Sequence, residues 1–213
     1  DLPTGPTAKV RSEENADVLS DHLVDVAASL GIVARTIVTD GTQPVGRGIG
    51  PALEAREVLA VLQNRPDASQ DLKHRAVLLA SNLIELATEL ELGQATEVAN
   101  SLLEDGRAWQ KFQAICEAQG GMREPPVAPY TRPIEASEAG RVGMIDNRLL
   151  ARIAKLAGAP SDRAAGVELH KKVGERVQTG EPLFTIHAES PGELHYAFNF
   201  AKTHSHVMTI EPS

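Results

Sequence analysis

The apolar positions in the first third of the chain predict a helix, a strand and a second helix. Ser12 can cap a helix that runs to about Leu30, and Gly31 ends it. Apolar residues recur at helical spacing along it, at Leu19, Leu23, Val26 and Leu30. The apolar run 32–39 predicts a buried strand, and a helix is expected from about 52 to 63. Strand followed by helix is the order of a parallel α/β layer.

Three more helices are predicted before the composition changes. The first runs from about 70 to 92, where Gly93 ends it, and two shorter ones follow, separated at Asp105 and Gly106. The last places apolar residues on one side, namely Trp109, Phe112, Ile115 and Cys116. On that face we expect Cys116 to be a buried, inert thiol and no nucleophile.

Glycine and proline then mark a domain boundary. Gly120 and Gly121 precede four prolines, which predict a stiff linker between domains at 1–120 and 121–213. Strands are expected after it at about 131–136, 140–145, 166–170, 182–187 and 207–210, with helices at 147–157 and 191–201. The predicted fold class is α/β: part of a parallel α/β domain with flanking helices, followed by an α+β domain with a barrel-sandwich-like β-hairpin at 171–188.

The segment 40–57, D-G-T-Q-P-V-G-R-G-I-G-P-A-L-E-A-R-E, has the densest pattern in the chain. A strand, a glycine-rich loop and a helix N-terminus in this order bring backbone groups close to a ligand or ion. The spacing of G-R-G-I-G is not that of a dinucleotide-binding loop. Glu54 and Glu57 fall in the first turns of the helix, where a carboxylate favours the helix dipole. Carbonyls of such a loop with one carboxylate also suit a hard cation, but from these residues alone the helix-capping and salt-bridge interpretation is favoured.

Composition narrows the classes of function. The 213 residues are 42% hydrophobic and 23% charged, which is typical of a globular protein. A net charge of −8 argues against nucleic acid as a partner. No apolar run is long enough for a bilayer, so no membrane partner is expected. A single cysteine is typical of the reducing cytoplasm, where we expect the protein. The chain opens on Asp1 inside a Gly/Pro-rich turn, so we expect a part of a longer polypeptide, with an exposed apolar patch where the remainder packs.

Two further binding interpretations are possible from the sequence, and neither is favoured. The segment 171–188, K-K-V-G-E-R-V-Q-T-G-E-P-L-F-T-I-H-A, looks like half of a biotinyl or lipoyl carrier domain, but no lysine for attachment follows it. Core positions on that view are Val173, Val177, Leu183 and Ile186. Four histidines raise the question of zinc, which needs three or four convergent ligands. They are His187, His195, His204 and His206. Surface histidines near a chain end are the commoner case, so the sequence predicts no zinc site.

Three segments together carry a family resemblance. They are D-L-P-T-G-P-T-A-K at 1–9, T-D-G-T-Q-P-V-G-R-G-I-G-P-A-L-E-A-R-E at 39–57 and K-K-V-G-E-R-V-Q-T-G-E-P-L at 171–183. In this order they resemble the carboxyl-terminal portion of pyrimidine-nucleoside phosphorylases, nearest to the long thymidine phosphorylases and the AMP phosphorylases. The resemblance implies reversible phosphorolysis, in which inorganic phosphate attacks the anomeric carbon of a nucleoside and the base leaves. It also implies a homodimer when full length and no required cofactor.

The resemblance assigns a few residues. Lys9 matches a substrate-binding lysine of the AMP phosphorylase branch, and Thr4 and Gly5 are expected to line the same pocket. The carbonyls of Val45 and Gly48 and the carboxylate of Glu57 match ligands of a structural potassium ion. The family's K-x-S-T-G-G phosphate loop is absent from the sequence, so the chain alone is expected to be inactive. Gly-Pro-Thr-Ala at 5–8 departs from the Gly-Arg-Gly-Ala of AMP phosphorylases, which leaves thymidine, uridine and AMP open as substrates.

Overall fold

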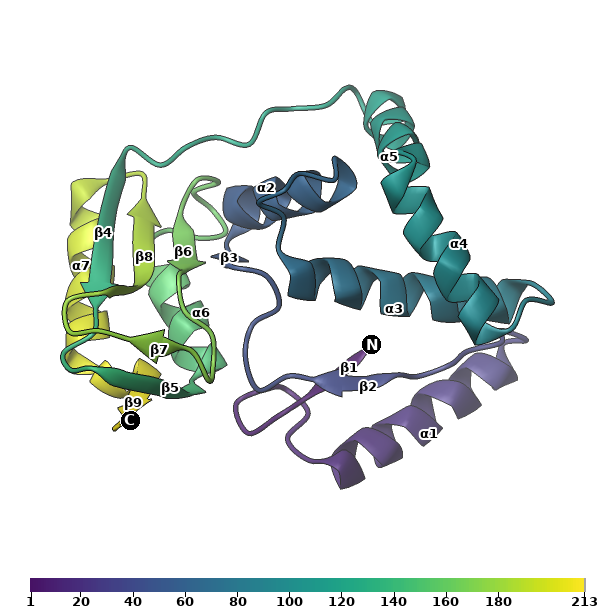
Figure 1. Ribbon diagram of the computed structural model, residues 1–213, viewed down its shortest axis with the longest axis horizontal. Coiled ribbons are helices and arrows are strands. Elements are labelled where there is room, and N and C mark those ends of the chain that lie inside the picture. The colour runs from purple at the N-terminus through teal and green to yellow at the C-terminus, as the bar shows by residue number, and fades with distance from the viewer. Residues whose placement is uncertain (213) are drawn as a thin grey trace.

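A computed structural model describes residues 1–212, and Figure 1 shows its elements. The helices are α1 Glu13–Ser29, α2 Pro51–Leu62, α3 Gln70–Ala87, α4 Leu92–Glu104, α5 Arg107–Ala118, α6 Asn147–Leu156 and α7 Pro191–Thr203, with a 3-10 turn η1 at Ser205–Val207. The strands are β1 Leu2–Thr4, β2 Val38–Asp40, β3 Gly48–Ile49, β4 Tyr130–Glu135, β5 Gly140–Ile145, β6 Gly166–Leu169, β7 Arg176–Val177, β8 Pro182–Ala188 and β9 Met208–Glu211. The α/β class predicted from the sequence is confirmed.

The parallel layer of the first part is small. β1 and β2 form a parallel two-stranded sheet, with Leu2 opposite Val38. The predicted buried strand 32–39 is wrong in extent and burial, since the strand begins at Val38 and the side chain of Val33 is 76% exposed. A parallel strand is buried only when helices cover both faces of its sheet. The described residues supply no such cover over 32–37.

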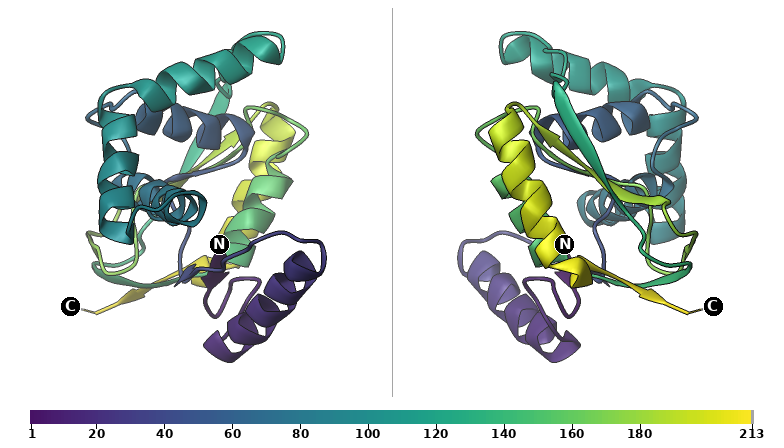
Figure 2. Two further views of the ribbon diagram at one scale, coloured as in Figure 1. Left: turned by 90° about the vertical axis from the view of Figure 1, so that its right-hand side faces the viewer. Right: turned by 90° about the vertical axis from the view of Figure 1, so that its left-hand side faces the viewer.

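Helix α1 has the predicted ends and an uncovered apolar face. The Ser12 hydroxyl accepts a hydrogen bond from the amide of Asn15, and Gly31 follows with a φ of +71°. Only Ala16 is buried along the helix, while Val26 is 60% exposed and Leu30 70%. Figures 1 and 2 show α1 at the edge of the molecule. The exposed apolar patch expected from the sequence is therefore present on this helix.

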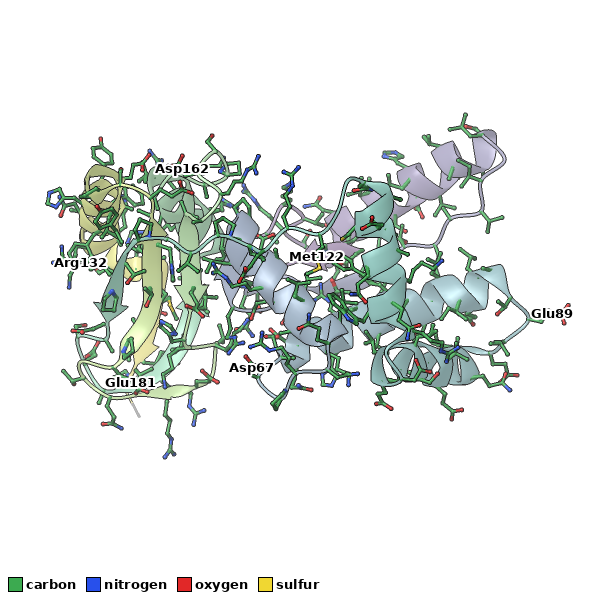
Figure 3. The ribbon with its side chains drawn as sticks, turned by 90° about the horizontal axis from the view of Figure 1, so that it is seen from above. Asp67, Glu89, Met122, Arg132, Asp162 and Glu181 are labelled. Atoms are coloured by element: carbon green, nitrogen blue, oxygen red, sulfur yellow. The ribbon has the colours of Figure 1, made fainter. Side chains whose placement is uncertain are left out.

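The long helix predicted at 70–92 is two helices. α3 ends at Ala87, and α4 begins after Glu91, so Gly93 starts a helix instead of ending one. Glu91 and the glutamine three residues on, Gln94, satisfy each other's backbone N–H groups in a capping box. This reciprocal cap stabilises a new helix start, and α4 packs back along α3. The connection around Glu89 lies at the end of the molecule opposite Arg132 of β4 (Figure 3).

Helix α5 corrects the expectation for the cysteine. The predicted break at Asp105 and Gly106 is confirmed, because Gly106 adopts a φ of +81° between α4 and α5. No residue of α5 is buried, and Cys116 is only half-buried. Cys116 and Phe112 line an open cavity of about 480 Å³ together with Val58 and Leu59 of α2, so the thiol is not enclosed in a core.

The carboxyl-terminal part contains the largest core. β3, β6, β8 and β4 form an antiparallel sheet in that order, and β7, β5 and β9 form a second one. Fully buried side chains of both sheets and of α6 meet between them, among them Phe184, Ile145 and Ile153. Of the predicted core positions in 171–188, three are buried and Val173 is partly buried; the three are Val177, Leu183 and Ile186. β7 and β8 lie in different sheets, so this hairpin joins the two layers.

The two parts share a sheet. β3 precedes the linker in sequence, yet it pairs with β6, with Ile49 opposite Val167. The first and second parts are thus joined by main-chain hydrogen bonds as well as by the linker, which Figure 1 shows crossing from α5 to β4. The domain boundary at 120/121 remains a prediction. Among the described residues, no helix has both the length and the apolar character required to cross a membrane.

Candidate functional site

The first candidate region is the turn that follows β1. Its neighbour after β2 is Gly41, and a Cβ on Gly5 would lie 2.8 Å from the Gly41 carbonyl carbon. Only glycine allows the two chain segments to approach this closely. Gly5 is buried, Thr4 is half-buried and Lys9 is exposed. The Thr4 hydroxyl donates to the carbonyl of Leu2 at 3.1 Å, so it points back along its own strand.

The turn holds all three predicted substrate-binding residues at one edge of the parallel pair. The Gly5 amide donates to the carbonyl of Val10 at 3.0 Å, which closes the turn. The carboxyl ends of parallel strands are where open α/β sheets bind ligands. The chain thus places Thr4, Gly5 and Lys9 at the edge where a ligand of such a sheet would lie.

Helix α6 supports this turn from the carboxyl-terminal part. The side-chain amide of Asn147 donates to the Gly41 carbonyl at 2.9 Å, and its backbone N–H donates to the Thr7 hydroxyl at 3.2 Å. Asn147 could not be identified as a site residue from the sequence. It is the first residue of a helix after the capping Asp146, and a polar residue is common at that position. No signal in the sequence relates it to residues more than a hundred positions earlier.

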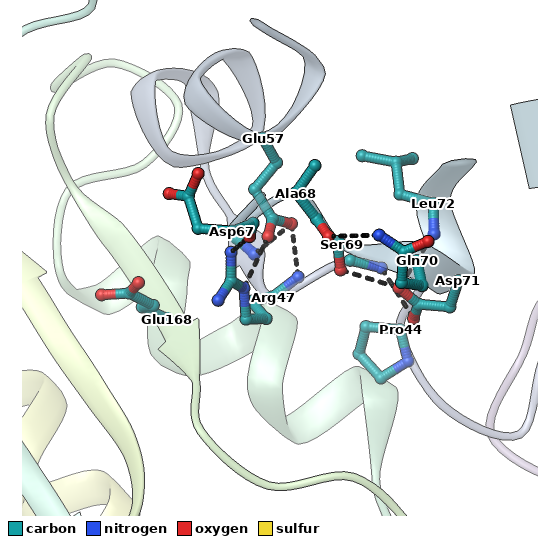
Figure 4. A network of polar contacts seen from close by, with 12 residues as sticks. Pro44, Arg47, Glu57, Asp67, Ala68, Ser69, Gln70, Asp71, Leu72 and Glu168 are labelled. Carbon is teal, nitrogen blue, oxygen red and sulfur yellow. Dashed lines mark hydrogen bonds and ion pairs between the residues drawn. The ribbon is translucent and has the colours of Figure 1, made fainter. Parts of the chain in front are cut away.

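The second candidate region is the glycine loop 44–50, which Glu57 supports from one side. The Glu57 side chain is 10% exposed. Its carboxylate accepts hydrogen bonds from the backbone N–H groups of Arg47 and Gly48 and from the Arg47 guanidinium, the last at 2.9 Å (Figure 4). The hydrogen bond to Glu57 raises the pKa of Arg47, while burial opposes the rise. In this structure the Glu57 carboxylate is therefore a hydrogen-bond acceptor for the N–H groups of the loop.

The other predicted ion ligands lie on the same loop. Val45 lies two residues before Arg47, and Gly48 follows Arg47 directly and begins β3. A cation at the Glu57 carboxylate would share it with a guanidinium, which lowers the attraction for the ion. Two carbonyls and a carboxylate suit a hard cation in donor type but are fewer than such an ion takes.

Lys172 and Asp71 hold the opposite side of the loop. The Lys172 ammonium donates to the Pro44 carbonyl at 2.6 Å, to the Gly46 carbonyl, and to an Asp71 carboxylate oxygen at 3.0 Å. The same Asp71 oxygen accepts the Gly46 amide at 3.1 Å. Burial raises the pKa of Asp71, but hydrogen bonds from Ser69 and Lys172 outweigh it and lower the pKa to about 2. Lys172 has no distinguishing signal in the sequence, where it is one of two adjacent lysines before a turn.

The Asp71 carboxylate predicts a pH dependence of stability. Its pKa falls from an ordinary 3.8 to about 2 on folding, so the ionised group stabilises the folded chain above about pH 4, and this contribution is lost as the pH falls toward 2. The stability difference between wild type and Asp71→Asn should be constant near neutral pH and shrink through this window. Urea unfolding at a series of pH values measures it. Lys172→Met should make the window narrower, and an equal difference at pH 2.5 and pH 6 would contradict the assignment.

The N-terminus of α2 is not an open anion site. The amide of Ala52 donates to the carbonyl of Arg163 at 3.0 Å, and the amide of Gly50 donates to Glu54 at 2.9 Å. With these donors used and a loop of the carboxyl-terminal part covering the helix end, the glycine loop cannot cradle a phosphate in the way that a phosphate-binding loop does. This agrees with the absence of a dinucleotide-binding pattern in the sequence.

The four histidines do not form a metal site, although the rings of His204 and His206 lie 5.9 Å apart between centroids. Among residues 1–212, no group of three or more His, Cys, Asp and Glu side chains is arranged to hold a metal ion. His204 stacks on Phe200 with ring centroids 3.9 Å apart, while His187 lies 3.4 Å from Glu168. After β8 the chain passes directly into α7, where the Ser190 hydroxyl caps the helix. An exposed hairpin tip with an attachment lysine is absent at that place.

Comparisons with known proteins agree with this fold. A family profile described as "Pyrimidine nucleoside phosphorylase C-terminal domain" matches residues 139–208. "Putative thymidine phosphorylase 1" of Acidovorax sp. (strain JS42) is 56% identical over 210 residues, which are 99% of this chain and 41% of that protein. "Putative thymidine phosphorylase" of Legionella pneumophila (strain Paris) is 54% identical over 210 residues, again 99% and 41% of the two chains. The protein of the same name from Tolumonas auensis is 52% identical over 212 residues, 100% of this chain and 42% of that one.

The chain thus spans about two-fifths of the length of these relatives, at their carboxyl-terminal end. The match covers nearly every residue, including the strand-end turn, the glycine loop and the sheets that hold it. The resemblance stated from the three sequence segments is confirmed: the chain belongs to the pyrimidine-nucleoside phosphorylase family, and it corresponds to the carboxyl-terminal part of the proteins named "Putative thymidine phosphorylase".

Proposed function

We propose that this chain is the carboxyl-terminal part of an enzyme that phosphorolyses thymidine or a related pyrimidine nucleoside. The observation that carries the proposal is the sequence identity of 52–56%, along 99–100% of this chain, to proteins named "Putative thymidine phosphorylase". In the reaction, a phosphate oxygen forms a bond to the anomeric carbon and the glycosidic carbon–nitrogen bond breaks. The base leaves with the electron pair of that bond and takes up a proton, and the sugar 1-phosphate remains. The products belong to pyrimidine salvage.

In this proposal, the turn after β1 borders the substrate. Lys9 would meet the nucleoside as a point charge, and Thr4 and Gly5 would line the pocket beside it. Support comes from their place at the carboxyl ends of β1 and β2, and from the exposure of Lys9. These residues hold and orient the substrate, which lowers the barrier by positioning. No residue of this chain is proposed as a catalytic acid, base or nucleophile.

The expected potassium ion also remains a proposal, with Val45, Gly48 and Glu57 as its ligands in this chain. The donor types suit the ion, while Arg47 already occupies the Glu57 carboxylate. Further ligands would have to come from outside the described residues. Homodimer formation by the full-length protein and a cytoplasmic location belong to the same proposal.

A phosphorolysis assay tests the function. The 213-residue chain and the complete polypeptide that contains it are each incubated with phosphate and thymidine, uridine or AMP, and the free base is measured. We expect turnover of a pyrimidine nucleoside by the complete polypeptide and none by the chain alone, because the phosphate-loop signature is absent from its sequence. Turnover by the chain alone, or turnover of AMP only, would contradict the proposal. A mass measurement that found covalent biotin or lipoyl would favour a carrier instead.

A further inference from the structure

The ammonium of Lys172 lies in an oxygen-lined site made by the other part of the chain. Its three acceptors are the carbonyls of Pro44 and Gly46 and the carboxylate of Asp71. The lysine side chain is 22% exposed, so the charge is largely withdrawn from water. Two carbonyl oxygens and one carboxylate around a single positive charge are the ligands that hard cations take in proteins. Here the cation is covalently part of the chain.

Backbone groups of the loop bind two side chains of opposite charge, Lys172 and Glu57, while the Gly46 amide binds Asp71 beside Lys172. The carbonyls of the loop at Pro44 and Gly46 point to Lys172, whereas its N–H groups at Arg47 and Gly48 point to Glu57. Charge-assisted hydrogen bonds of this kind are about twice as strong as neutral ones. The conformation of the loop therefore depends on a cation on one face and an anion on the other.

Two neighbouring contacts extend the hold of the carboxyl-terminal part on this loop. The amide of Val173 donates to the Gln43 side chain at 2.9 Å, and the amide of Leu169 donates to the Arg47 carbonyl at 2.8 Å. The segment 169–173 thus contacts the loop and the residue before it at three points, and Lys172 makes the only charged contact of the three. A change at Lys172 should loosen the loop while the flanking main-chain contacts keep the two parts together.

We propose that Lys172 is a positioning residue that serves as the built-in monovalent cation of the glycine loop. Its ammonium holds the loop in the conformation that phosphorolysis requires, and this role rests on the proposed function. The potassium ion expected at Val45, Gly48 and Glu57 would use other atoms of the loop. The two cation sites are therefore separate, and removal of one does not imply removal of the other.

The adjacent Lys171 provides a matched control. Its ammonium contacts Glu181 at 2.5 Å and the Arg176 carbonyl at 3.3 Å, both within the carboxyl-terminal part. The two lysines have similar exposure, 18% for Lys171 and 22% for Lys172, and the same charge. They differ in that only Lys172 reaches the glycine loop.

The experiment is chemical rescue in the complete polypeptide. Lys172→Ala should lower kcat about 10- to 100-fold, the range expected when charge-assisted hydrogen bonds are lost, while Lys171→Ala stays within about twofold of wild type. Added propylammonium should restore a large part of the Lys172→Ala activity, because it can refill the site with an N–H donor. Tetramethylammonium has the charge without the donors and should restore none.

A second readout separates this inference from the proposed function. In the 213-residue chain, amide hydrogen exchange at Gly46 and Gly48 should be faster in Lys172→Ala than in wild type and unchanged in Lys171→Ala. An inactive wild-type polypeptide would overturn the phosphorolysis proposal. Full activity of Lys172→Ala, a loss that no amine restores, or unchanged exchange at the loop would overturn the role of Lys172.

Discussion

Replacing Glu57 with alanine is expected to lower the free energy of unfolding by about 2–4 kcal/mol. The carboxylate is nearly buried and accepts hydrogen bonds from two backbone N–H groups and one guanidinium, all from Arg47 and Gly48. Its removal leaves the two backbone N–H groups without an acceptor beside a nearly buried side chain, and the cost of their desolvation is then no longer offset. The Arg47 guanidinium, whose side chain is 43% exposed, can turn to water instead. Urea or thermal unfolding of wild type and variant measures the difference.

Asp105→Ala is the control that tests whether the effect of Glu57→Ala depends on burial of the carboxylate. Its carboxylate also accepts hydrogen bonds from a backbone N–H and a guanidinium, both of Arg107, but the side chain is 44% exposed. Asp105→Ala should cost much less stability than Glu57→Ala, because water replaces the lost acceptor. If both alanine variants lose the same stability, the effect is general to paired carboxylates and Glu57 has no special part in holding the loop.

The helix ends and the carboxyl-terminal strands could be predicted from the sequence because their signals are local. Ser12, Gly31 and Gly106 act on the backbone within a few residues of themselves, and the structure has all three where they were expected. The break between α3 and α4 was missed, although Glu91 and Gln94 are a local signal too. Their polar pair was outweighed by the apolar periodicity that continues across the break.

The degree of burial in the first part of the chain could not be predicted, because it depends on which other elements cover a helix or strand. The apolar pattern of that helix or strand does not show this. The periodicity of α1 gives the correct helix, but periodicity cannot say whether Val26 meets another element. The strand 32–39 failed for the same reason: an apolar run indicates burial only if the sheet has covered faces.

The candidate site likewise has features that could be predicted from the sequence and features that could not. The glycine pattern indicated a loop that brings the backbone close to other groups, and Glu57 was identified within it from the family resemblance. Lys172 lies 128 residues beyond Pro44, and Asn147 lies 106 beyond Gly41. Such long-range polar contacts have no spacing rule in the sequence. They become visible only when β3 is seen to join the sheet of the carboxyl-terminal part.

The junction of β3 with that sheet is expected to be highly sensitive to an added side chain. Gly50 has a φ of +133°, and a Cβ there would lie 2.4 Å from the carbonyl oxygen of Ala165. Gly50→Ala should therefore cost about 2–6 kcal/mol, the sum of backbone strain and overpacking against a carbonyl that cannot move freely. Thermal unfolding measures the loss. Limited trypsin digestion reports its place, since cleavage after Arg47 requires that β3 leave β6.

Gly180→Ala distinguishes steric overlap from backbone strain. Gly180 has a φ of +82° with no atom within 4 Å of an added Cβ, so its substitution should cost only about 1–2 kcal/mol and leave Arg47 protected from trypsin. If Gly50→Ala is no worse than Gly180→Ala, the close approach at Ala165 does not hold β3 in place. If it is worse and Arg47 becomes accessible, the glycine loop owes its conformation to the carboxyl-terminal sheet. The loop that Glu57 and Lys172 hold would then depend on the same contact, and Gly50→Ala in the complete polypeptide should lower phosphorolysis along with stability.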